Sequence, residues 1–240
     1  MLYAQVAIPR PLHHLLIYQV PEKLQAQLQM GHRVLVPLRN RTQVGFILGI
    51  INELPQNLDS TKIKPIQEIL DPKPVFSQKK LDLINWMAKY YCAAIGEVCK
   101  ASLPSRLTKI NAPKAGRTQL PVELELVPEH KPELTLTNDQ LAALDIILHN
   151  LNINNPKPLL LHGITGSGKT EVYLRAFEQI KQQGENGILL VPEISLTPQL
   201  IQRFREKFGE QIAVYHSALT DAQRYAQWRK IKNKEVFAVV

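Results

Sequence analysis

Cysteine is scarce in this sequence, and its two copies, Cys92 and Cys99, stand seven residues apart without a histidine or cysteine at metal-ligand spacing. This pattern predicts reduced thiols of a cytosolic protein and argues against a structural disulfide. No apolar run reaches about 18 residues, so no membrane-spanning helix is expected. The N-terminus also lacks the charged, apolar and small-residue order of a signal peptide. We therefore expect a cytoplasmic protein without a membrane partner.

Carboxylates are scarce in the first half of the chain. Residues 1–110 contain 14 Lys and Arg against 7 Asp and Glu, a difference of +7, whereas residues 111–240 contain 15 against 14, a difference of +1. A basic half favours a polyanionic partner, with nucleic acid the leading candidate. The alternative is a basic surface that serves only solubility. The length of 240 residues suits one large or two ordinary domains.

Short strands dominate roughly the first 70 residues. Residues 2–8 alternate between apolar and other side chains, which predicts a half-buried strand with Leu2, Ala4, Val6 and Ile8 on one face. Further strands are expected at residues 15–20, 33–38, 43–51 and 63–70, the middle two forming a hairpin. Gly45 and Gly49 indicate bulges or a curved, barrel-like sheet.

A helix is predicted after this β-domain, beginning at Ser77 as its N-cap. Its spacing places Leu81, Ile84, Ala88 and Tyr91 on one face and Trp86 and Tyr90 on other faces. The aromatic residues Trp86, Tyr90 and Tyr91 have two interpretations: they stack on nucleic-acid bases, or they belong to the core. At helical spacing beside a β-domain, the core interpretation is favoured.

The second half alternates between strands and helices. Thr137 and Gln140 form a capping-box pattern that opens a helix over residues 141–151. Strands are expected at 159–162, 187–192, 212–215 and 236–240, with helices between them. The run 187–192 is continuously apolar, which is typical of a parallel strand buried on both faces. This order predicts a doubly wound α/β lobe.

A phosphate-binding loop lies at the centre of this lobe. The octet from Gly163 to Thr170 fits G-x-x-x-x-G-K-[ST], with an apolar run before it and a helical pattern after it. Such a loop points backbone N–H groups and a helix N-terminus at one anion. Lys169 is then expected to reach the β- and γ-phosphates of ATP, and the Thr170 hydroxyl to hold Mg²⁺. The alternative is a glycine-rich turn that binds nothing.

The sequence also resembles a known family along most of residues 1–110 and 135–240. GITGSGKTEVY at 163–173, VPEISLTPQ at 191–199, RFREKF at 203–208 and YHS at 215–217 closely resemble the bacterial replication-restart helicase family PriA (primosomal protein N′). The resemblance implies a superfamily 2 DNA translocase that uses ATP and Mg²⁺ to unwind DNA 3′ to 5′ at stalled forks and to seed primosome assembly. Forked or single-stranded DNA, primosome proteins and single-strand-binding proteins would be its partners.

The resemblance also implies roles for individual residues. Gln140 matches the position that reads adenine, and the phosphate cradle would consist of Gly163, Thr165, Gly166, Ser167, Gly168, Lys169 and Thr170. Contacts with single-stranded backbone are implied for Pro192, Glu193, Thr197, His216 and Ser217. In the N-terminal domain, which resembles the family's module for the 3′ end of a nascent strand, DNA contacts are implied for Tyr18, Arg39 and Lys64.

This chain departs from the family pattern at several points. Leu16 and Ile17 precede Tyr18 where the family has an aromatic-acidic pair, and Arg39 stands where it favours glycine. General basic contact with DNA is expected nevertheless. The linker is too short for the family's winged-helix module. We therefore expect a β-rich 3′-end-binding-like domain over 1–103, a linker over 104–134 and a RecA-like P-loop helicase lobe, cut short, over 135–240.

The resemblance also implies an acidic Asp-Glu-x-His motif, a second motor lobe with arginine fingers and zinc-binding cysteines, and these are expected to lie beyond the end of this chain or to be missing. Such a chain should bind ATP weakly and hydrolyse it poorly, since half of the composite site is absent. Two competing hypotheses remain. One is a non-catalytic module that binds DNA or a protein partner and keeps a vestigial P-loop; the weaker one is a small P-loop kinase.

Overall fold

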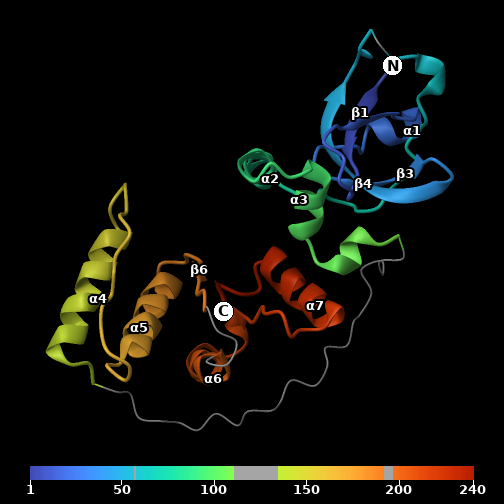
Figure 1. The fold of residues 1–240 in the computed structure, drawn as a ribbon. Coiled ribbons are helices and arrows are strands. Elements are labelled where there is room, and N and C mark those ends of the chain that lie inside the picture. Colours follow the sequence, from blue (N-terminus) through green and yellow to red (C-terminus); the bar gives the residue numbers. More distant parts are fainter. Residues whose placement is uncertain (57, 111–134, 192–196) are drawn as a thin grey trace. The chain divides into compact units, whose positions relative to one another are not determined.

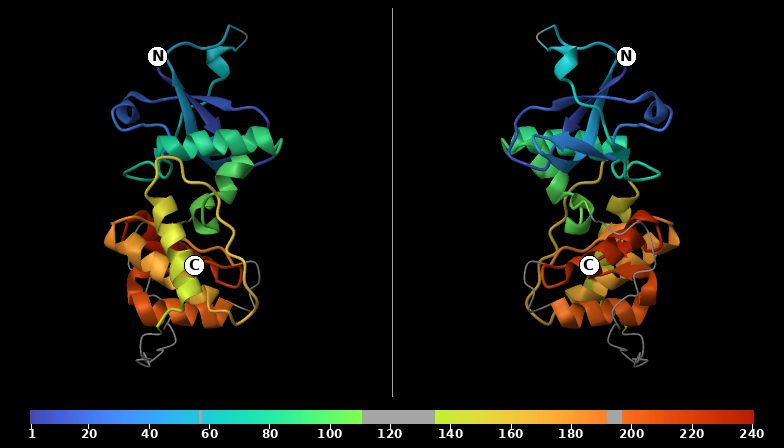
Figure 2. Two further views of the ribbon diagram at one scale, coloured as in Figure 1. Left: turned by 90° about the vertical axis from the view of Figure 1, so that its left-hand side faces the viewer. Right: turned by 90° about the vertical axis from the view of Figure 1, so that its right-hand side faces the viewer.

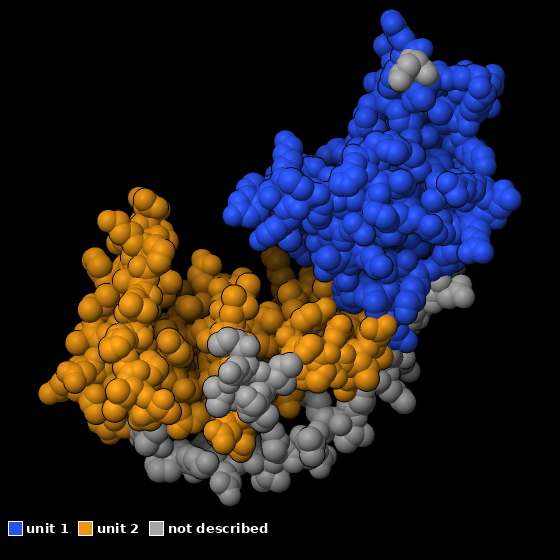
Figure 3. Space-filling model, in the orientation of Figure 1, with its two compact units in different colours: residues 1–117 blue, residues 118–240 orange. Residues whose placement is uncertain are grey.

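The computed structural model describes residues 1–240 except for residue 57 and the segments 111–134 and 192–196. The chain divides into two compact units, residues 1–117 (unit 1) and 118–240 (unit 2), coloured separately in Figure 3. Most of the expected linker lies outside the described residues, as do Pro192 and Glu193. Each unit is described by itself.

Unit 1 is a five-stranded antiparallel sheet with short helices (Figure 1). The strands run in the order β2-β1-β4-β3-β5. Their bounds are β1 Tyr3–Ala7, β2 Leu16–Gln19, β3 Arg33–Leu38, β4 Arg41–Ile51 and β5 Glu68–Ile69, and the helices are α1 Glu22–Gln25, a 3₁₀ turn Ser60–Lys62, α2 Gln78–Tyr90, α3 Ile95–Ala101 and a second 3₁₀ turn Ser105–Thr108. The expected antiparallel domain with a β3–β4 hairpin is thus confirmed.

The sheet curves because β4 carries a bulge and because its two edges are joined. Gln5 pairs with Gly49 but Val6 pairs with Ile47, so Leu48 is an extra residue in β4. This bulge lies beside Gly49, as the sequence indicated. At the edges, the Gln19 N–H donates to the Lys64 carbonyl at 3.0 Å, and the Ile66 N–H donates to the Gln19 carbonyl at 2.9 Å. The segment predicted as a strand over 63–70 is reduced to β5 and this bridge.

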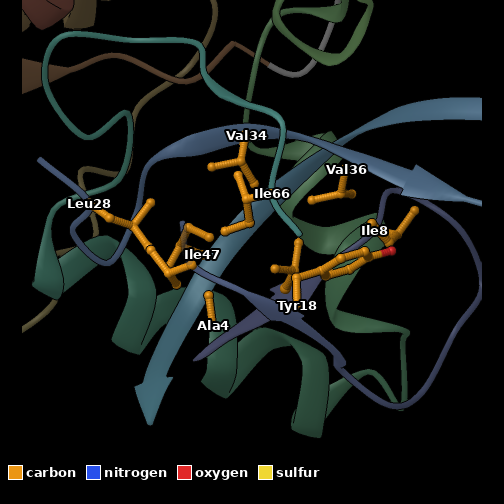
Figure 4. Packing of buried hydrophobic residues seen from close by; sticks show 10 residues of the cluster. Ala4, Ile8, Tyr18, Leu28, Val34, Val36, Ile47 and Ile66 are labelled. Atoms are coloured by element: carbon orange, nitrogen blue, oxygen red, sulfur yellow. The ribbon is translucent and has the colours of Figure 1, made fainter. Parts of the chain in front are cut away.

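The concave side of the sheet holds the main core of unit 1. Figure 4 shows its side chains, which come from strands and loops far apart in the chain and point into a common interior. Ala4 and Val6 of β1 face it, which confirms the predicted alternation of faces; the expected half-burial is wrong, because Tyr3 and Ala7 on the other face are also buried. The cluster consists of Ala4, Val6, Ile8, Tyr18, Val20, Leu28, Val34, Val36, Ile47 and Ile66.

The other side of the sheet is covered by α2 and α3 (Figure 2). Phe46 of β4 packs against Phe76 with 5.5 Å between ring centroids. α3 approaches β1 so closely that a Cβ on Gly96 would overlap the carbonyl oxygen of Ile8. Ser77 is the N-cap of α2 as predicted, although its side chain makes no capping hydrogen bond. Glycine at position 96 therefore permits the contact between helix and strand.

The aromatic residues at the end of α2 do not belong to this core. Trp86, Tyr90 and Tyr91 expose 54%, 67% and 64% of their surface, so the core interpretation is wrong. They pack on one another, with 5.0 Å between the rings of Trp86 and Tyr90. Helical spacing explains the error: Leu81 and Ile84 already fill the buried face, and Trp86 and Tyr90 lie on the opposite side of the helix.

Unit 2 combines four helices with a three-stranded parallel sheet of order β6-β8-β7 among its described residues. Phe177, Phe204 and Phe208 form its core with aliphatic residues of the strands. The alternation of helix and strand agrees with the predicted α/β lobe. The elements are α4 Asn138–Leu151, α5 Lys169–Gln182, β6 Gly187–Ile188, α6 Thr197–Phe208, a 3₁₀ turn Gly209–Gln211, β7 Ile212–Ala213, α7 Asp221–Lys232 and β8 Ala238–Val239.

Two strand predictions in unit 2 are wrong. Residues 159–162 form no strand, and Leu160 exposes 91% of its surface. The run 187–192 was expected to be buried on both faces, but β6 ends at Ile188, and Ile188 and Leu190 expose 71% and 87%. An apolar run forms a buried strand only where neighbouring strands pair with it and other side chains pack over it. Among the described residues, no strand pairs with residues 159–162, and no side chains bury Ile188 and Leu190.

Candidate functional site

The phosphate loop leads directly into α5, which begins at Lys169. Gly166 and Gly168 have φ values of +83° and +81°, a region that side chains with a Cβ rarely adopt. A Cβ on Gly168 would also overlap Nε2 of Gln140. The glycines therefore allow the chain to turn into the helix so that the first N–H groups of α5, which lack intrahelical acceptors, face the loop.

Lys169 folds back over this loop. Its Nζ donates to the carbonyl oxygens of Gly163 at 2.5 Å and Ile164 at 2.8 Å. Among the described residues, no carboxylate forms an ion pair with Lys169. Its charge is therefore balanced only by carbonyl dipoles, which suits an ammonium group that receives an anion. Thr170 follows in the first turn of α5 and is partly buried.

Gln140 connects the start of α4 to the loop with both ends of its amide. Its Oε1 accepts from the backbone N–H of Thr137 at 2.9 Å, and its backbone N–H donates to the Thr137 hydroxyl, which completes the predicted capping box. Its Nε2 donates to the carbonyl of Ser167 at 2.9 Å. One side chain thus caps a helix and holds the phosphate loop.

A hollow of about 310 Å³ lies between the start of α4 and the loop. This volume suits a small polar ligand, and the glycine turn, the helix N-terminus and the ammonium group fit the phosphates of a nucleotide with Mg²⁺. Sequence reasoning missed Asp139 and Ala143, which share a side of α4 with Gln140 by helical spacing. The lining residues are Thr137, Asp139, Gln140, Ala143, Leu161, His162, Gly163, Ile164, Ser167, Lys169 and Val172.

The loop residues Thr165, Gly166 and Ser167 are exposed. Other predicted contacts of unit 2 follow strands. His216 and Ser217 follow the end of β7 at Ala213 by three and four residues, and the Ser217 carbonyl accepts from Nη2 of Arg224. Thr197 begins α6, the helix that follows β6. Because the carboxyl ends of parallel strands meet at one edge, these positions belong to the same edge of the sheet.

The three predicted DNA contacts of unit 1 are brought together at the β3–β4 hairpin. Tyr18 is buried with 4% exposed, and its hydroxyl donates to the Pro37 carbonyl at 3.0 Å. This burial raises the pKa of Tyr18. Nζ of Lys64 donates to the Arg39 carbonyl at 3.3 Å. Arg39 and Lys64 are exposed, whereas Tyr18 presents no ring face to a base and acts by fixing the end of β3.

The described residues show no metal centre and no bridged thiols. No group of three or more His, Cys, Asp or Glu among them is placed to hold a metal ion. Cys92 is exposed and Cys99 is buried, and both are free thiols. Burial raises the pKa of Cys99 to about 12. None of the helices in the described part of the chain is long and apolar enough to cross a membrane.

Two family matches cover the two units. Residues 5–104 match the 3′ DNA-binding domain (3′BD) of PriA. Residues 133–239 match a family described as type III restriction enzyme, res subunit.

Several curated proteins are similar to the chain, and the following three carry the description replication restart protein PriA. The protein of Treponema pallidum is 36% identical over 205 residues, which is 85% of this chain and 30% of that protein. The protein of Rickettsia conorii is 32% identical over 240 residues, 100% of this chain and 34% of that protein. The protein of Bacillus subtilis is 51% identical over 107 residues, 45% of this chain and 13% of that protein. The chain thus spans about a third or less of the length of these relatives.

Proposed function

The chain belongs to the PriA family of replication restart proteins, whose N-terminal portion it represents, and on this basis we propose that it is the N-terminal part of an ATP-dependent 3′-to-5′ DNA helicase. Its relatives are described as replication restart proteins. Unit 1 would bind forked or single-stranded DNA, and unit 2 would bind ATP.

The observation that carries the nucleotide role is the arrangement of Lys169 over the glycine turn. A triphosphate would replace the Gly163 and Ile164 carbonyls as the partner of the ammonium group. The N–H groups at the start of α5 would donate to its β-phosphate, and the Thr170 hydroxyl would ligate Mg²⁺. ATP with Mg²⁺ supplies a phosphoanhydride bond whose hydrolysis drives translocation in such motors. Gln140 would face the adenine, as the family resemblance implies.

We expect this chain by itself to hydrolyse ATP poorly. Among the described residues that line the hollow, the one carboxylate is Asp139 and there is no arginine. Charge that develops on the transferred phosphoryl group would therefore be stabilised by Lys169 and backbone N–H groups alone. Strong DNA-stimulated turnover by the 240 residues would contradict this expectation.

The DNA role is supported by the charge of unit 1 and by its match to a 3′ DNA-binding domain. The exposed cations Arg39 and Lys64 would contact the strand, with Tyr18 fixing the hairpin beneath them. In unit 2, Thr197, His216 and Ser217 would contact single-stranded backbone, and the family resemblance implies the same role for Pro192 and Glu193. The cytoplasm would be the site of action, and primosome and single-strand-binding proteins would be the protein partners.

Fluorescence anisotropy with two labelled DNAs of equal length tests this function. One is a fork with an exposed 3′ end at its branch, and the other is a duplex closed by loops at both ends. We expect tighter binding to the fork, because the closed duplex offers no strand end. Equal affinity for both, or no binding to either, would refute the DNA role of unit 1.

A second candidate is a non-catalytic DNA- or partner-binding module with an idle P-loop. The hydrogen bonds from Lys169 to its own loop are compatible with this alternative. The variant Lys169→Ala separates the two. If its DNA binding and cellular role in replication restart equal those of the native chain, the nucleotide site is idle.

A further inference from the structure

The segment between β7 and α7 contains a tight turn over residues 216–219. The Leu219 N–H donates to the His216 carbonyl at 3.3 Å, so Ser217 and Ala218 are the central residues of the turn. Both are exposed. The hydrogen bond that closes the turn uses neither the carbonyl of Ser217 nor the N–H of Ala218, which together belong to the central peptide unit. We call residues 216–219 the β7–α7 turn.

Arg224 of α7 holds the central peptide of this turn. Its Nη2 donates to the Ser217 carbonyl. Within the described part of the chain, no carboxylate forms an ion pair with Arg224, and its Nε is buried without a hydrogen-bond partner. Arg175 of α5 shows the contrast, because its Nε donates to Oε1 of Glu171 at 3.2 Å. The guanidinium group of Arg224 is therefore committed to the turn and not to an acid.

This hydrogen bond sets the direction of the next N–H group. A trans peptide unit is planar, so its carbonyl and its N–H point in opposite directions. Because the Ser217 carbonyl is directed at Arg224, the Ala218 N–H is directed away from it. None of the described residues accepts a hydrogen bond from this N–H. The turn therefore presents an unpaired backbone donor at an exposed residue.

The central peptide of such a turn has two orientations. The two commonest turn types, I and II, differ mainly by a flip of this peptide, and type II requires a positive φ at the second central residue. Ala218 has no positive φ, which suits a residue with a Cβ. A flip would turn the Ala218 N–H toward Arg224, where a donor would meet a donor. Arg224 therefore stabilises the orientation in which this N–H is free.

We propose that Arg224 is a positioning residue for single-stranded DNA, which orients the Ser217–Ala218 peptide so that the Ala218 N–H donates to a backbone phosphate. This inference rests on the proposed function, in which His216 and Ser217 contact the strand. Backbone N–H groups are frequent partners of phosphate oxygens, which only accept. The Ser217 hydroxyl belongs to the same peptide segment and supplies a second donor. Arg224 itself stays on the Ser217 carbonyl and does not contact the phosphate.

Fluorescence anisotropy of the whole chain with a circular single-stranded DNA tests this inference. The circle has no 3′ end, so the end-binding role proposed for unit 1 does not contribute to the signal. Arg224→Met keeps the apolar stem and removes the donors, and it should weaken binding about 3- to 10-fold, as the loss of one hydrogen bond would. Arg224→Lys keeps one donor group for the Ser217 carbonyl and should bind with intermediate affinity.

The salt dependence of binding separates positioning from direct contact. A cation that contacts a phosphate releases counterions, so its removal lowers the slope of log K against log salt by about one. Arg224→Met should keep the native slope, because the contact it loses comes from a neutral N–H. Arg229→Met, the same substitution at another partly buried arginine of α7, is the matched control and should leave both affinity and slope unchanged.

The outcomes separate this inference from the proposed function. Unchanged affinity in Arg224→Met, a slope reduced by about one, or an equal loss in Arg229→Met would overturn the positioning role. Hydrogen exchange checks that Arg224→Met remains folded, and Arg224→Lys carries the test if it does not, since native affinity in that variant would also overturn the role. A native chain that binds a fork with a 3′ end but not the circle overturns this inference alone, whereas failure to bind either DNA would overturn the proposed function as well.

Discussion

The double role of Gln140 leads to a prediction in which one substitution weakens nucleotide binding without unfolding the helix. Gln140→Glu keeps the acceptor that receives the Thr137 N–H and places a negative charge in the first turn of α4, where the helix dipole favours it. It removes the Nε2 donor that holds the Ser167 carbonyl at 2.9 Å. The helix should therefore remain capped, while the phosphate loop loses its tether.

The magnitude follows from two terms. An exposed neutral hydrogen bond contributes about 0.5–1 kcal/mol. A carboxylate near the phosphates in water-exposed surroundings adds a repulsion of about 0.5–1 kcal/mol. Together these terms weaken Mg-ATP binding by about 1–2 kcal/mol, which corresponds to roughly a 5- to 30-fold higher Kd. A fluorescent ATP analogue, titrated in the presence of Mg²⁺, measures this change.

The chain contains a matched control for this prediction. Gln223 occupies the same position in the capping box of α7, where its Oε1 accepts from the Thr220 N–H at 2.9 Å. It does not line the hollow at the loop. Gln223→Glu should therefore leave the Kd unchanged. The reasoning is refuted if Gln140→Glu binds within twofold of the native chain, or if Gln223→Glu weakens binding equally.

Three further predictions concern the stability and reactivity of unit 1. Gly96→Ala should destabilise unit 1 by about 2 kcal/mol, because the added Cβ would overlap the Ile8 carbonyl. Hydrogen exchange measures this change. Helix propensity alone predicts the opposite sign, a stabilisation of about 1 kcal/mol. Trp86→Ala should lower the free energy of unfolding by less than about 1 kcal/mol because the Trp86 ring is exposed, whereas Phe46→Ala should lower it by about 3–5 kcal/mol because Phe46 is fully buried. Similar losses for the two variants in chemical denaturation would contradict the exposed placement of Trp86. Thiol reagents followed by mass spectrometry should modify Cys92 and spare Cys99, and equal labelling of both native thiols would show that Cys99 is not buried. Because the folded pKa of Cys99, about 12, exceeds its reference value of 9.0, the unfolded state loses the thiol proton first as the pH rises. The free energy of unfolding of unit 1 should therefore fall between pH 9 and 12.

The parts of the fold that sequence could predict are those decided by neighbouring residues. The alternation along β1, the hairpin and the capping box of α4 depend on periods of two or on contacts within four residues. The P-loop belongs to the same group, because its turn and its lysine lie within eight residues. Each of these features appears at the predicted position.

The failures are features decided by distant residues. The run 159–162 has the composition of a strand, but a strand requires partners, and composition does not reveal whether they pair. Trp86 and Tyr90 have core composition, but Leu81 and Ile84 already occupy the buried face of α2. The link from Gln140 to Ser167 spans 27 residues and depends on how α4 and α5 pack, so the sequence indicated a capping role and left this bond unseen.

Calorimetric titration of the chain with Mg-ATP, beside the Lys169→Ala variant, tests the central claim most directly. The native chain should show weak, saturable binding, and the variant should show none. The variant lacks the ammonium group of Lys169, which donates to the loop carbonyls in the free chain and would donate to phosphate oxygens in the complex. Heats that are the same for both proteins, whether large or absent, would contradict the assignment of the nucleotide site to this loop.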